Sequence, residues 1–302
     1  MLTDLQVKIL QLKEQNNIAI LAHCYQQPEI LEVADVVGDS FMLATAAKKL
    51  NQPNVVMCGV KFMGETVKIL SPEKNVIMPV PNATCPMAEM ITAKDIIKFK
   101  ENNPVFKVVA YINTTAEVKA VCDVCVTSSS ALKIVSQIKE PVLFVPDKNL
   151  GSYIKSQLGT KDIVLMHGCC PIHDKVTAED VKAAKELFPG YPVAMHPEVP
   201  AEAVALADFV GSTTEIMDYC EQNGGDVIIG TEKSICDHMS LRHPERRYPL
   251  LSKQLLCGDM KMITLGDVYK AVRGNGYPIE MSEELRLAAK KPIDMMLQMN
   301  NA

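Results

Sequence analysis

The chain has 302 residues, of which 48% are hydrophobic and 22% are charged, a composition typical of a globular protein with a large core. Its net charge of −5 provides no basic surface of the kind that binds nucleic acid, so we exclude nucleic acid as a partner. No apolar run approaches the roughly 18–20 residues that cross a membrane, and the N-terminal residues predict an amphipathic helix instead of a signal peptide. We therefore expect a cytoplasmic protein that does not enter the membrane.

Three successive segments of the chain open with the same helix signal, a capping box or a close variant of one. In this motif a hydroxyl and a later side chain satisfy the first N–H groups of a helix. The pairs are Thr3 with Gln6, Thr92 with Asp95, and Thr177 with Asp180. Apolar runs typical of strands follow, separated by helical stretches. The runs cover residues 18–23, 55–60 and 75–80, then 107–112, 141–146 and 162–167, then 191–196, 226–231 and, more weakly, 254–259.

Strands that are apolar throughout and alternate with helices indicate parallel sheets covered on both faces. We therefore predict an α/β fold of three pseudo-threefold-related α/β domains, each a small parallel sheet covered by helices. The predicted domains cover residues 1–85, 86–170 and 171–257, and residues 258–302 form a C-terminal extension that begins like a truncated fourth copy. Because ligands bind beyond the carboxyl ends of parallel strands, we expect the active site where the three domains converge.

Polar residues occupy equivalent positions after the first strand of each copy. The first position holds His23, Tyr111 and His196, the second holds Tyr25, Asn113 and Glu198, and a third, near a helix start, holds Ser40, Ser128 and Thr213. A lone histidine is more often structural, but two histidines at equivalent positions favour a function. The hydroxyl residues have two interpretations, as helix caps or as donors to an anion, and both roles can hold together.

Each copy closes on a cysteine, and these are Cys85, Cys170 and Cys257. One interpretation is that they are core thiols, because free cysteine is among the most buried residue types. The even spacing favours the other interpretation, in which three thiolates meet at one metal centre. A structural zinc would usually require four ligands, whereas three thiolates suit a [4Fe–4S] cluster with one open iron that acts as a Lewis acid.

Other cysteines and charged residues are weaker candidates. Cys169 is an alternative ligand to Cys170, but the position before proline, which Cys85 shares, favours Cys170. Cys122 and Cys125 form a CxxC pair without counterparts in the other copies, so we interpret them as packing residues and not as a redox pair. We interpret His173 as a wall of the site and Lys148 as a solvated loop charge. The basic residues of 242–247 are interpreted as a loop or subunit contact.

Several segments together resemble the quinolinate synthase family. They include AHCYQ (22–26), PNATCPMA (81–88), YINTTAEVKA (111–120), GCCPIH (168–173), MHPE (195–198) and CGDMKMITL (257–265). The matches keep their order over nearly the whole chain. The chain lacks the C-terminal CxxCxxC segment of some members, which is typical of the shorter form.

The resemblance implies condensation of iminoaspartate with dihydroxyacetone phosphate to quinolinate, with loss of phosphate and two waters, in de novo NAD biosynthesis. It implies that Cys85, Cys170 and Cys257 hold the [4Fe–4S] cluster. The implied substrate-facing residues are His23, Tyr25, Ser40, Tyr111, Asn113, Ser128, His196, Glu198, Ser212 and Thr213. An L-aspartate oxidase or an aspartate dehydrogenase is implied as the partner that supplies iminoaspartate.

The chemistry of this reaction suggests a role for each group. Glu198 is the best candidate for general acid/base, because proton abstraction beside a carbonyl or an imine is required. His23 and His196 donate to a carboxylate or relay protons, and Tyr25 and Tyr111 carry protons or bind the ketone.

Two other classes of function fit one cysteine in each repeated domain. One is a reductive dehydroxylase or a radical-generating amine-transfer enzyme, which would require electrons from a partner. The other is a non-catalytic iron–sulfur or redox sensor. Turnover without a reductant excludes the first class, and dependence of product formation on Glu198 excludes the second.

Overall fold

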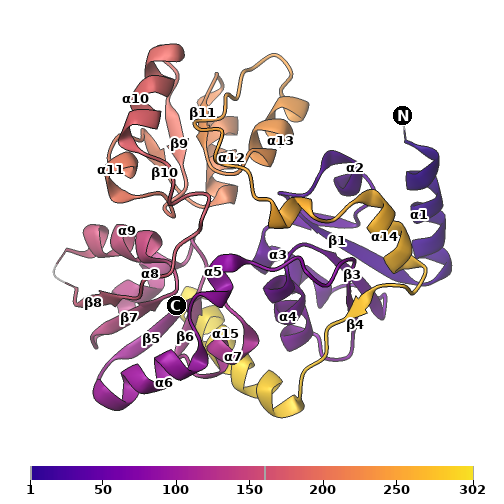
Figure 1. The fold of residues 1–302 in the computed structure, drawn as a ribbon, viewed down its shortest axis with the longest axis horizontal. Coiled ribbons are helices and arrows are strands. Elements are labelled where there is room, and N and C mark those ends of the chain that lie inside the picture. Colours follow the sequence, from indigo (N-terminus) through magenta and orange to yellow (C-terminus); the bar gives the residue numbers. More distant parts are fainter. Residues whose placement is uncertain (1, 160, 302) are drawn as a thin grey trace. The chain divides into compact units, whose positions relative to one another are not determined.

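The computed structural model describes residues 2–159 and 161–301 and has an α/β fold (Figure 1). The chain divides into two compact units. Unit 1 comprises Met1–Cys85 and Cys257–Lys290, and unit 2 comprises Pro86–Leu256 and Lys291–Ala302. Among the helices of the described residues, none is both long and apolar enough to cross a membrane.

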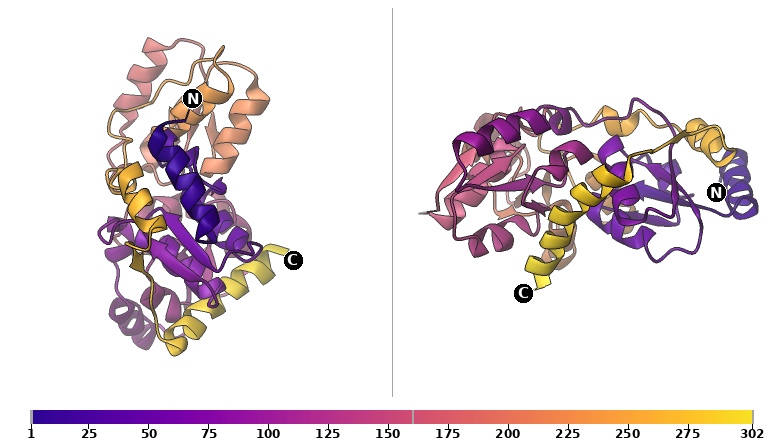
Figure 2. Two further views of the ribbon diagram at one scale, coloured as in Figure 1. Left: turned by 90° about the vertical axis from the view of Figure 1, so that its right-hand side faces the viewer. Right: turned by 90° about the horizontal axis from the view of Figure 1, so that it is seen from below.

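Unit 1 is built around a five-stranded sheet in the order β12-β4-β3-β1-β2, in which only β12 is antiparallel to its neighbour. Helix α1 packs against α14, and together they cover apolar residues of β1 and β3 (Figures 1 and 2). The elements are α1 (Asp4–Gln15), β1 (Ile18–His23), α2 (Pro28–Leu31), β2 (Val36–Gly38), α3 (Ser40–Ala47), β3 (Asn54–Cys58), α4 (Lys61–Leu70), β4 (Asn75–Met78), η1 (Asp259–Lys261), α14 (Leu265–Val272) and β12 (Tyr277–Pro278). Helix α15 (Glu283–Asn301) contributes its first residues to unit 1 and its last to unit 2.

Unit 2 contains two parallel sheets, of four and three strands, in the orders β6-β5-β7-β8 and β10-β9-β11. The first sheet and its helices comprise α5 (Pro86–Glu89), α6 (Ala93–Asn102), β5 (Lys107–Tyr111), α7 (Ala116–Ala120), β6 (Val124–Val126), α8 (Ala131–Gln137), β7 (Val142–Val145), α9 (Lys148–Leu158) and β8 (Ile163–Leu165). The second comprises α10 (Ala178–Leu187), β9 (Val193–Met195), α11 (Ala201–Val204), β10 (Phe209–Val210), α12 (Thr213–Asn223), β11 (Ile228–Gly230) and α13 (Ser234–Arg242).

The predicted α/β fold with small parallel sheets covered by helices is confirmed. The capping boxes at Thr3, Thr92 and Thr177 are present and start α1, α6 and α10. A further capping box at Thr264 starts α14, where the truncated fourth copy was predicted. The boundaries of three separate domains at residues 85, 170 and 257 stay a prediction.

Two parts of the strand prediction were wrong. The stretches after the first strand of each copy were interpreted as helices, and each does contain a short and a longer helix, but a short strand, β2, β6 or β10, separates the two. Strands of two or three residues are too short for hydrophobic periodicity to distinguish. The weak run 254–259 is not a strand, since Leu255 is buried but Leu256 is exposed, and the run ends in the short helix η1.

An identical polar contact supports the first strand of each copy. An aspartate just before the second strand accepts an N–H from the first strand, three residues before the first polar position. A lysine of the preceding helix binds the same aspartate. The strand contacts are Ile20 N–H to Asp35 at 2.7 Å, Val108 N–H to Asp123 at 2.8 Å and Val193 N–H to Asp208 at 2.8 Å. The lysines are Lys13, Lys100 and Lys185, at 2.8, 3.4 and 3.0 Å from the aspartates.

We call this contact the lysine–aspartate clamp. It joins one helix and two strands at the end of the sheet away from the carboxyl ends of the strands, so it fixes the register of the first strand without entering the expected site. The clamps differ in exposure, because the Lys13 side chain is 10% exposed whereas that of Lys185 is 40% exposed. Lys13 also donates to the Val33 carbonyl at 2.9 Å.

The difference in exposure predicts unequal contributions to stability. We expect Lys13→Ala to lower the free energy of unfolding by about 1–3 kcal/mol, since it leaves a carboxylate and a carbonyl in a half-buried place without their charged donor. The same change at Lys185 removes a solvent-screened pair and should cost less than about 1 kcal/mol. Urea unfolding of the two variants measures both values, and equal losses would contradict the assignment.

Candidate active site

The candidate site lies at the carboxyl ends of the strands in unit 2. Tyr111 is the last residue of β5, and His196 directly follows β9; both side chains are buried. The backbone after each histidine turns back, so that the N–H of Glu198 donates to the Nδ1 atom of His196 at 3.3 Å. Unit 1 repeats this turn, where Tyr25 N–H donates to His23 Nδ1 at 3.1 Å. The two equivalent histidines therefore share one local geometry, in which Nδ1 is an acceptor.

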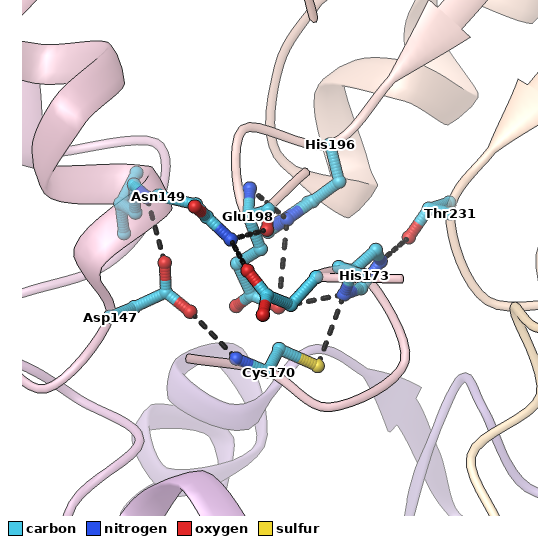
Figure 3. Close-up of polar contacts among 9 residues, drawn as sticks. Asp147, Asn149, Cys170, His173, His196, Glu198 and Thr231 are labelled. Atoms are coloured by element: carbon cyan, nitrogen blue, oxygen red, sulfur yellow. Dashed lines mark hydrogen bonds and ion pairs between the residues drawn. The ribbon is translucent and has the colours of Figure 1, made fainter. Parts of the chain in front are cut away.

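Asp147 fixes the loop that carries Cys170. One carboxylate oxygen of Asp147 accepts the Leu150 N–H at 2.7 Å and caps α9, and the other accepts the Cys170 N–H at 2.9 Å (Figure 3). Gly168 makes the close approach possible, because a Cβ there would lie 2.6 Å from the Pro146 carbonyl oxygen. The backbone of Cys170 is thus held by the turn after β7.

Asn149 joins the two sheets of unit 2. Its side-chain amide donates to the Asp174 carboxylate at 2.8 Å and to the Glu198 carbonyl at 2.9 Å. Asp174 in turn binds Lys148 at 3.0 Å, and its backbone N–H donates to the Cys170 carbonyl at 2.9 Å. The loop after β8 and the loop after β9 are therefore positioned by the same turn.

The carboxylate of Glu198 is the centre of the site. It is 4% exposed, lies 2.8 Å from the Nδ1 atom of His173, and accepts a hydrogen bond from the Tyr111 hydroxyl. Burial alone would raise its pKa, but the electrostatic effect of the His196 and His173 imidazoles and the hydrogen bonds from His173 and Tyr111 lower the pKa to about 2. Glu198 is therefore an ionised, buried carboxylate at neutral pH, as a general base requires.

The neighbours of Glu198 have shifted pKa values of their own. Burial, the charge of Glu198 and the hydrogen bond to it hold the pKa of Tyr111 well above its usual value, so its hydroxyl stays protonated and donates. Burial lowers the pKa of His196 to about 4, which keeps this imidazole neutral. The pKa of Asp147 is raised by burial and by the charge of Glu198. Several shifted groups that converge on one place are typical of enzyme sites.

A continuous series of hydrogen bonds crosses the site from one sheet to the other. Ser128 bonds to the Tyr111 hydroxyl, Tyr111 to Glu198, Glu198 to His173, and His173 to the Thr231 hydroxyl at 3.1 Å. Figure 3 shows the second half of the series, with His173 between Glu198, Thr231 and Cys170. His196 stacks on His173 with ring centroids 5.1 Å apart.

The thiols of the chain fall into two groups. Cys85, Cys170 and Cys257 are partly exposed and lie outside helices and strands, as ligands to an added group would require. Cys58, Cys125 and Cys220 are buried, and burial raises the pKa of each thiol, to about 12 for the last two, so they suit packing. Three soft thiolate donors fit an iron–sulfur cluster.

The environment of Cys170 differs from that of Cys169. Ligand atoms of Cys170, His173 and Glu198 all lie within 4.8 Å of one another, so this thiol faces the site. Partial burial and a hydrogen bond to Asp174 raise the pKa of the Cys169 thiol to about 11. A thiol held in the protonated form is a poor metal ligand, which favours Cys170 over Cys169.

In unit 1, the residues after β1 are tied to the segment that follows Cys257. The Gln26 side chain donates to the Met260 carbonyl at 2.8 Å, and Lys261 donates to the Tyr25 carbonyl at 2.6 Å. The His23 and Tyr25 rings make an edge contact with centroids 4.6 Å apart. The predicted substrate residues His23 and Tyr25 therefore share a local structure with the loop of a predicted cluster cysteine.

The predicted hydroxyl residues divide between the two interpretations. Asp39 caps α3, so Ser40 is the first helical residue and not the cap. Ser128 bonds Tyr111, as described above. Ser212 does cap α12, where its hydroxyl accepts the Glu215 N–H at 3.4 Å, and Thr213 follows as a buried residue of the first turn. The substrate roles of Ser40, Ser212, Thr213 and half-buried Asn113 stay predictions.

Asp147, Asn149 and Thr231 were not predicted as site residues, and His173 was predicted only as a wall. A signal was present for Asp147, since an aspartate after a buried apolar run and three residues before Leu150 is a helix cap at a strand end. Thr231 has a weaker signal, as the polar last residue of the predicted run 226–231. Its role depends on a contact across 58 residues of sequence.

The fold and the site define a class of protein. An ionised buried carboxylate, a protonated tyrosine and neutral histidines at the carboxyl ends of parallel strands are typical of an acid–base site in an α/β enzyme.

Comparisons with known proteins identify the family. Residues 7–298 match the family described as Quinolinate synthetase A protein. Curated relatives named quinolinate synthase include those of Caldicellulosiruptor bescii (43% identical, covering 98% of each chain), Clostridioides difficile (42%, covering 98% of this chain and 97% of the relative) and Fusobacterium nucleatum (43%, covering 97% and 98%). The chain belongs to the quinolinate synthase family, enzymes of NAD biosynthesis.

The neutral state of His23 predicts a pH dependence of stability. Burial lowers its pKa from 6.5 to about 4, so below pH 6.5 the unfolded chain binds a proton that the folded chain does not. Stability should be constant above about pH 7 and fall as the pH decreases toward 4, with a contribution from His23 of about 2 kcal/mol between pH 7 and 5. Urea unfolding at the two pH values measures the loss.

The variant His23→Asn should show a smaller loss than the wild type, since the asparagine oxygen still accepts the Tyr25 N–H but does not titrate. His167→Asn, at an exposed histidine, is the control and should leave the loss unchanged. An identical pH dependence in His23→Asn and wild type would contradict the interpretation.

Proposed function

We propose that the enzyme condenses iminoaspartate with dihydroxyacetone phosphate to quinolinate, with loss of phosphate and two waters. The proposed cofactor is a [4Fe–4S] cluster on Cys85, Cys170 and Cys257 with one open iron. The observation that carries the proposal is the ionised Glu198 carboxylate next to the Cys170 thiol, in a chain that belongs to this family. The cluster would supply a Lewis acid for the loss of a hydroxyl group in dehydration.

The side chains around Glu198 suit the proton transfers of this reaction. Glu198 accepts a proton from the carbon beside the imine or carbonyl, because it is the ionised carboxylate of the site. The Tyr111 hydroxyl, which donates to Glu198, donates to an oxygen of the substrate instead, or is shared between the two acceptors. Neutral His196 and His23 have Nδ1 occupied by a backbone N–H, so each presents Nε2–H as a donor to a carboxylate.

The remaining predicted residues offer neutral donors to the carboxylates and the phosphate. Helix α12 begins at Thr213 with Ser212 as its cap, and the N–H groups of a helix start attract anions. Ser40, Asn113 and Ser128 add hydroxyl and amide donors, and Tyr25 adds a phenol. Neutral donors suit a site whose product must be released after reaction, because pairing with full positive charges would bind the product tightly.

The proposed substrates also suggest the setting of the enzyme. Iminoaspartate hydrolyses readily in water, so we propose that an L-aspartate oxidase or an aspartate dehydrogenase supplies it close to its point of use. Both substrates are small, charged metabolites, which favours a cytoplasmic enzyme.

A second candidate for the metal centre rests on a separate observation. Cys170, His173 and Glu198 lie within ligand distance of one another and have the donor types of a zinc site. A mononuclear site would contain metal but no sulfide. The hydrogen bonds of His173 and Glu198 to Thr231 and Tyr111 favour the cluster, because they leave both side chains engaged in the acid–base site.

Anaerobic purification followed by iron, sulfide and zinc analysis tests the cofactor. We expect about four iron and four sulfide per chain, and loss of both in Cys85→Ser, Cys170→Ser and Cys257→Ser. Cys169→Ser is the matched control for Cys170→Ser and should keep the cluster. Zinc without sulfide would favour the second candidate, and protein that is metal-free under these conditions would contradict both.

The role of Glu198 is tested by Glu198→Gln, which keeps the shape and removes the base. We expect quinolinate formation to fall at least about 10²-fold, with the iron and sulfide content unchanged. The assay contains iminoaspartate and dihydroxyacetone phosphate without a reductant, so wild-type turnover also excludes reductive chemistry. Glu202→Gln, at an exposed glutamate, is the control. Full activity of Glu198→Gln would refute the proposed acid–base role and favour a sensor.

A further inference from the structure

Two side chains of unit 1 join the loop after β1 to the segment after Cys257, and the proposed reaction uses neither of them. The Gln26 amide donates to the Met260 carbonyl at 2.8 Å, and the Lys261 ammonium donates to the Tyr25 carbonyl at 2.6 Å. Each segment thus provides one side-chain donor and one backbone acceptor to the other. We call this pair of contacts the β1–η1 latch.

The β1–η1 latch fixes the backbone of both segments, because both of its acceptors are main-chain carbonyls. The N–H of Tyr25 is also held, by His23 Nδ1 at 3.1 Å, so both polar backbone groups of this residue have partners. The charge of Lys261 also reaches the His23 ring. Burial is the main cause that lowers the pKa of His23, Asp39 opposes it, and Lys261 adds to it. The predicted substrate residues His23 and Tyr25 are therefore held from the segment that follows Cys257.

Stability alone does not explain the buried amide of Gln26. The side chain is 0% exposed, and its Oε1 atom has no hydrogen-bond partner among the residues that the structure describes. An unpaired buried oxygen lowers stability. A leucine at this position would remove that oxygen but would also remove the donor to the Met260 carbonyl, so the two costs offset each other. The contact of Gln26 therefore acts mainly on the position of the Met260 backbone.

The loops of the three proposed cluster ligands are held in different ways. A backbone hydrogen bond of 2.8 Å ties the loop of Cys85 to the start of α4, and the turn after β7 holds the backbone of Cys170. Neither of these two supports contains a predicted substrate residue. The β1–η1 latch, in contrast, joins the loop of Cys257 to the loop of His23 and Tyr25. A group bound at Cys257 and a substrate bound at Tyr25 thus act on one local structure.

We propose that Gln26 and Lys261 are positioning residues that couple the loop of Cys257 to the substrate residues after β1. The proposal rests on the cofactor and the substrate residues of the proposed function. Coupling between two sites is reciprocal, so a change at one end of the β1–η1 latch has an effect at the other end. Binding of the cluster at Cys257 would order the loop that receives substrate, and disorder of that loop would weaken retention of the cluster.

The first test changes the loop after β1 and measures the effect at the cluster. We expect cluster-loaded Gln26→Leu to release iron to a chelator, without air, about 3–10-fold faster than the wild type, as expected for loss of one hydrogen bond. Its urea midpoint should stay close to that of the wild type, since one unpaired oxygen replaces another. Gln27→Leu is the matched control, because Gln27 precedes α2 without a side-chain capping bond. This control should release iron at the wild-type rate.

The second test changes the segment after Cys257 and measures the effect at the substrate loop. The backbone N–H groups of residues 24–26 are all hydrogen-bonded, so their hydrogen exchange reports on the order of this loop. We expect exchange there to be about 3–10-fold faster in cluster-loaded Lys261→Met than in the wild type. Lys261→Arg keeps a charged donor and should restore slow exchange. Lys253→Met, at an exposed lysine as far before Cys257 as Lys261 is after it, is the matched control.

Activity separates positioning of Tyr25 from a general loss of structure. We expect Lys261→Met to lower kcat/KM for quinolinate formation about 3–10-fold when Tyr25 is present. In a Tyr25→Phe background the same change should cause a smaller loss, because the hydroxyl that it displaces is already absent. Equal losses in the two backgrounds would contradict the positioning of Tyr25.

Two further outcomes overturn the proposal. One is iron release at the wild-type rate in Gln26→Leu, and the other is wild-type hydrogen exchange of residues 24–26 in Lys261→Met. Both are read against a wild-type protein that contains iron and sulfide and forms quinolinate. A wild type that lacks the cluster or forms no quinolinate contradicts the proposed function itself, so the two failures are distinguishable.

Discussion

A single buried negative charge determines much of the arrangement in unit 2. An ionised carboxylate away from water is costly unless other groups hydrogen-bond to it, and Glu198 has His173 and Tyr111 for this purpose. Each partner must itself be held, by Thr231 on one side and Ser128 on the other. Hydrogen bonds around this one side chain thus connect the loops after four strands of two sheets.

The turn of residues 146–149 also helps to position Glu198. Asp147 holds the backbone of Cys170, while Asn149 holds the backbone of Glu198, so the acid–base group and the proposed cluster ligand are placed by neighbouring residues. A displacement of this turn would move both groups together. The distance between Glu198 and Cys170 is therefore less sensitive to motion of the loops than the position of either residue alone. This matters because a shift of about 1 Å in an active site can lower the rate about 10²-fold.

Sequence reasoning predicted the features that repeat and missed those that occur once. The capping boxes, the first strands and the residues at 23, 111, 196 and 198 could be found because each has counterparts at equal spacing. Thr231 and Asn149 have no periodic signal, since their roles depend on contacts between loops far apart in sequence. Strands of two or three residues such as β10 were missed for a different reason. Their pairing comes from the neighbouring strand and not from their own pattern.

The three lysine–aspartate clamps have a consequence for how the protein tolerates change. Each copy carries its own support at the amino-terminal side of its first strand, and no clamp shares a residue with the opposite end where His23, Tyr111 and His196 differ. Substitutions in the loops at the carboxyl ends of the strands therefore leave the lysine–aspartate clamp of each copy intact. Three copies of one architecture are thereby free to become chemically unlike one another, and the two dissimilar substrates that we propose would require that inequality.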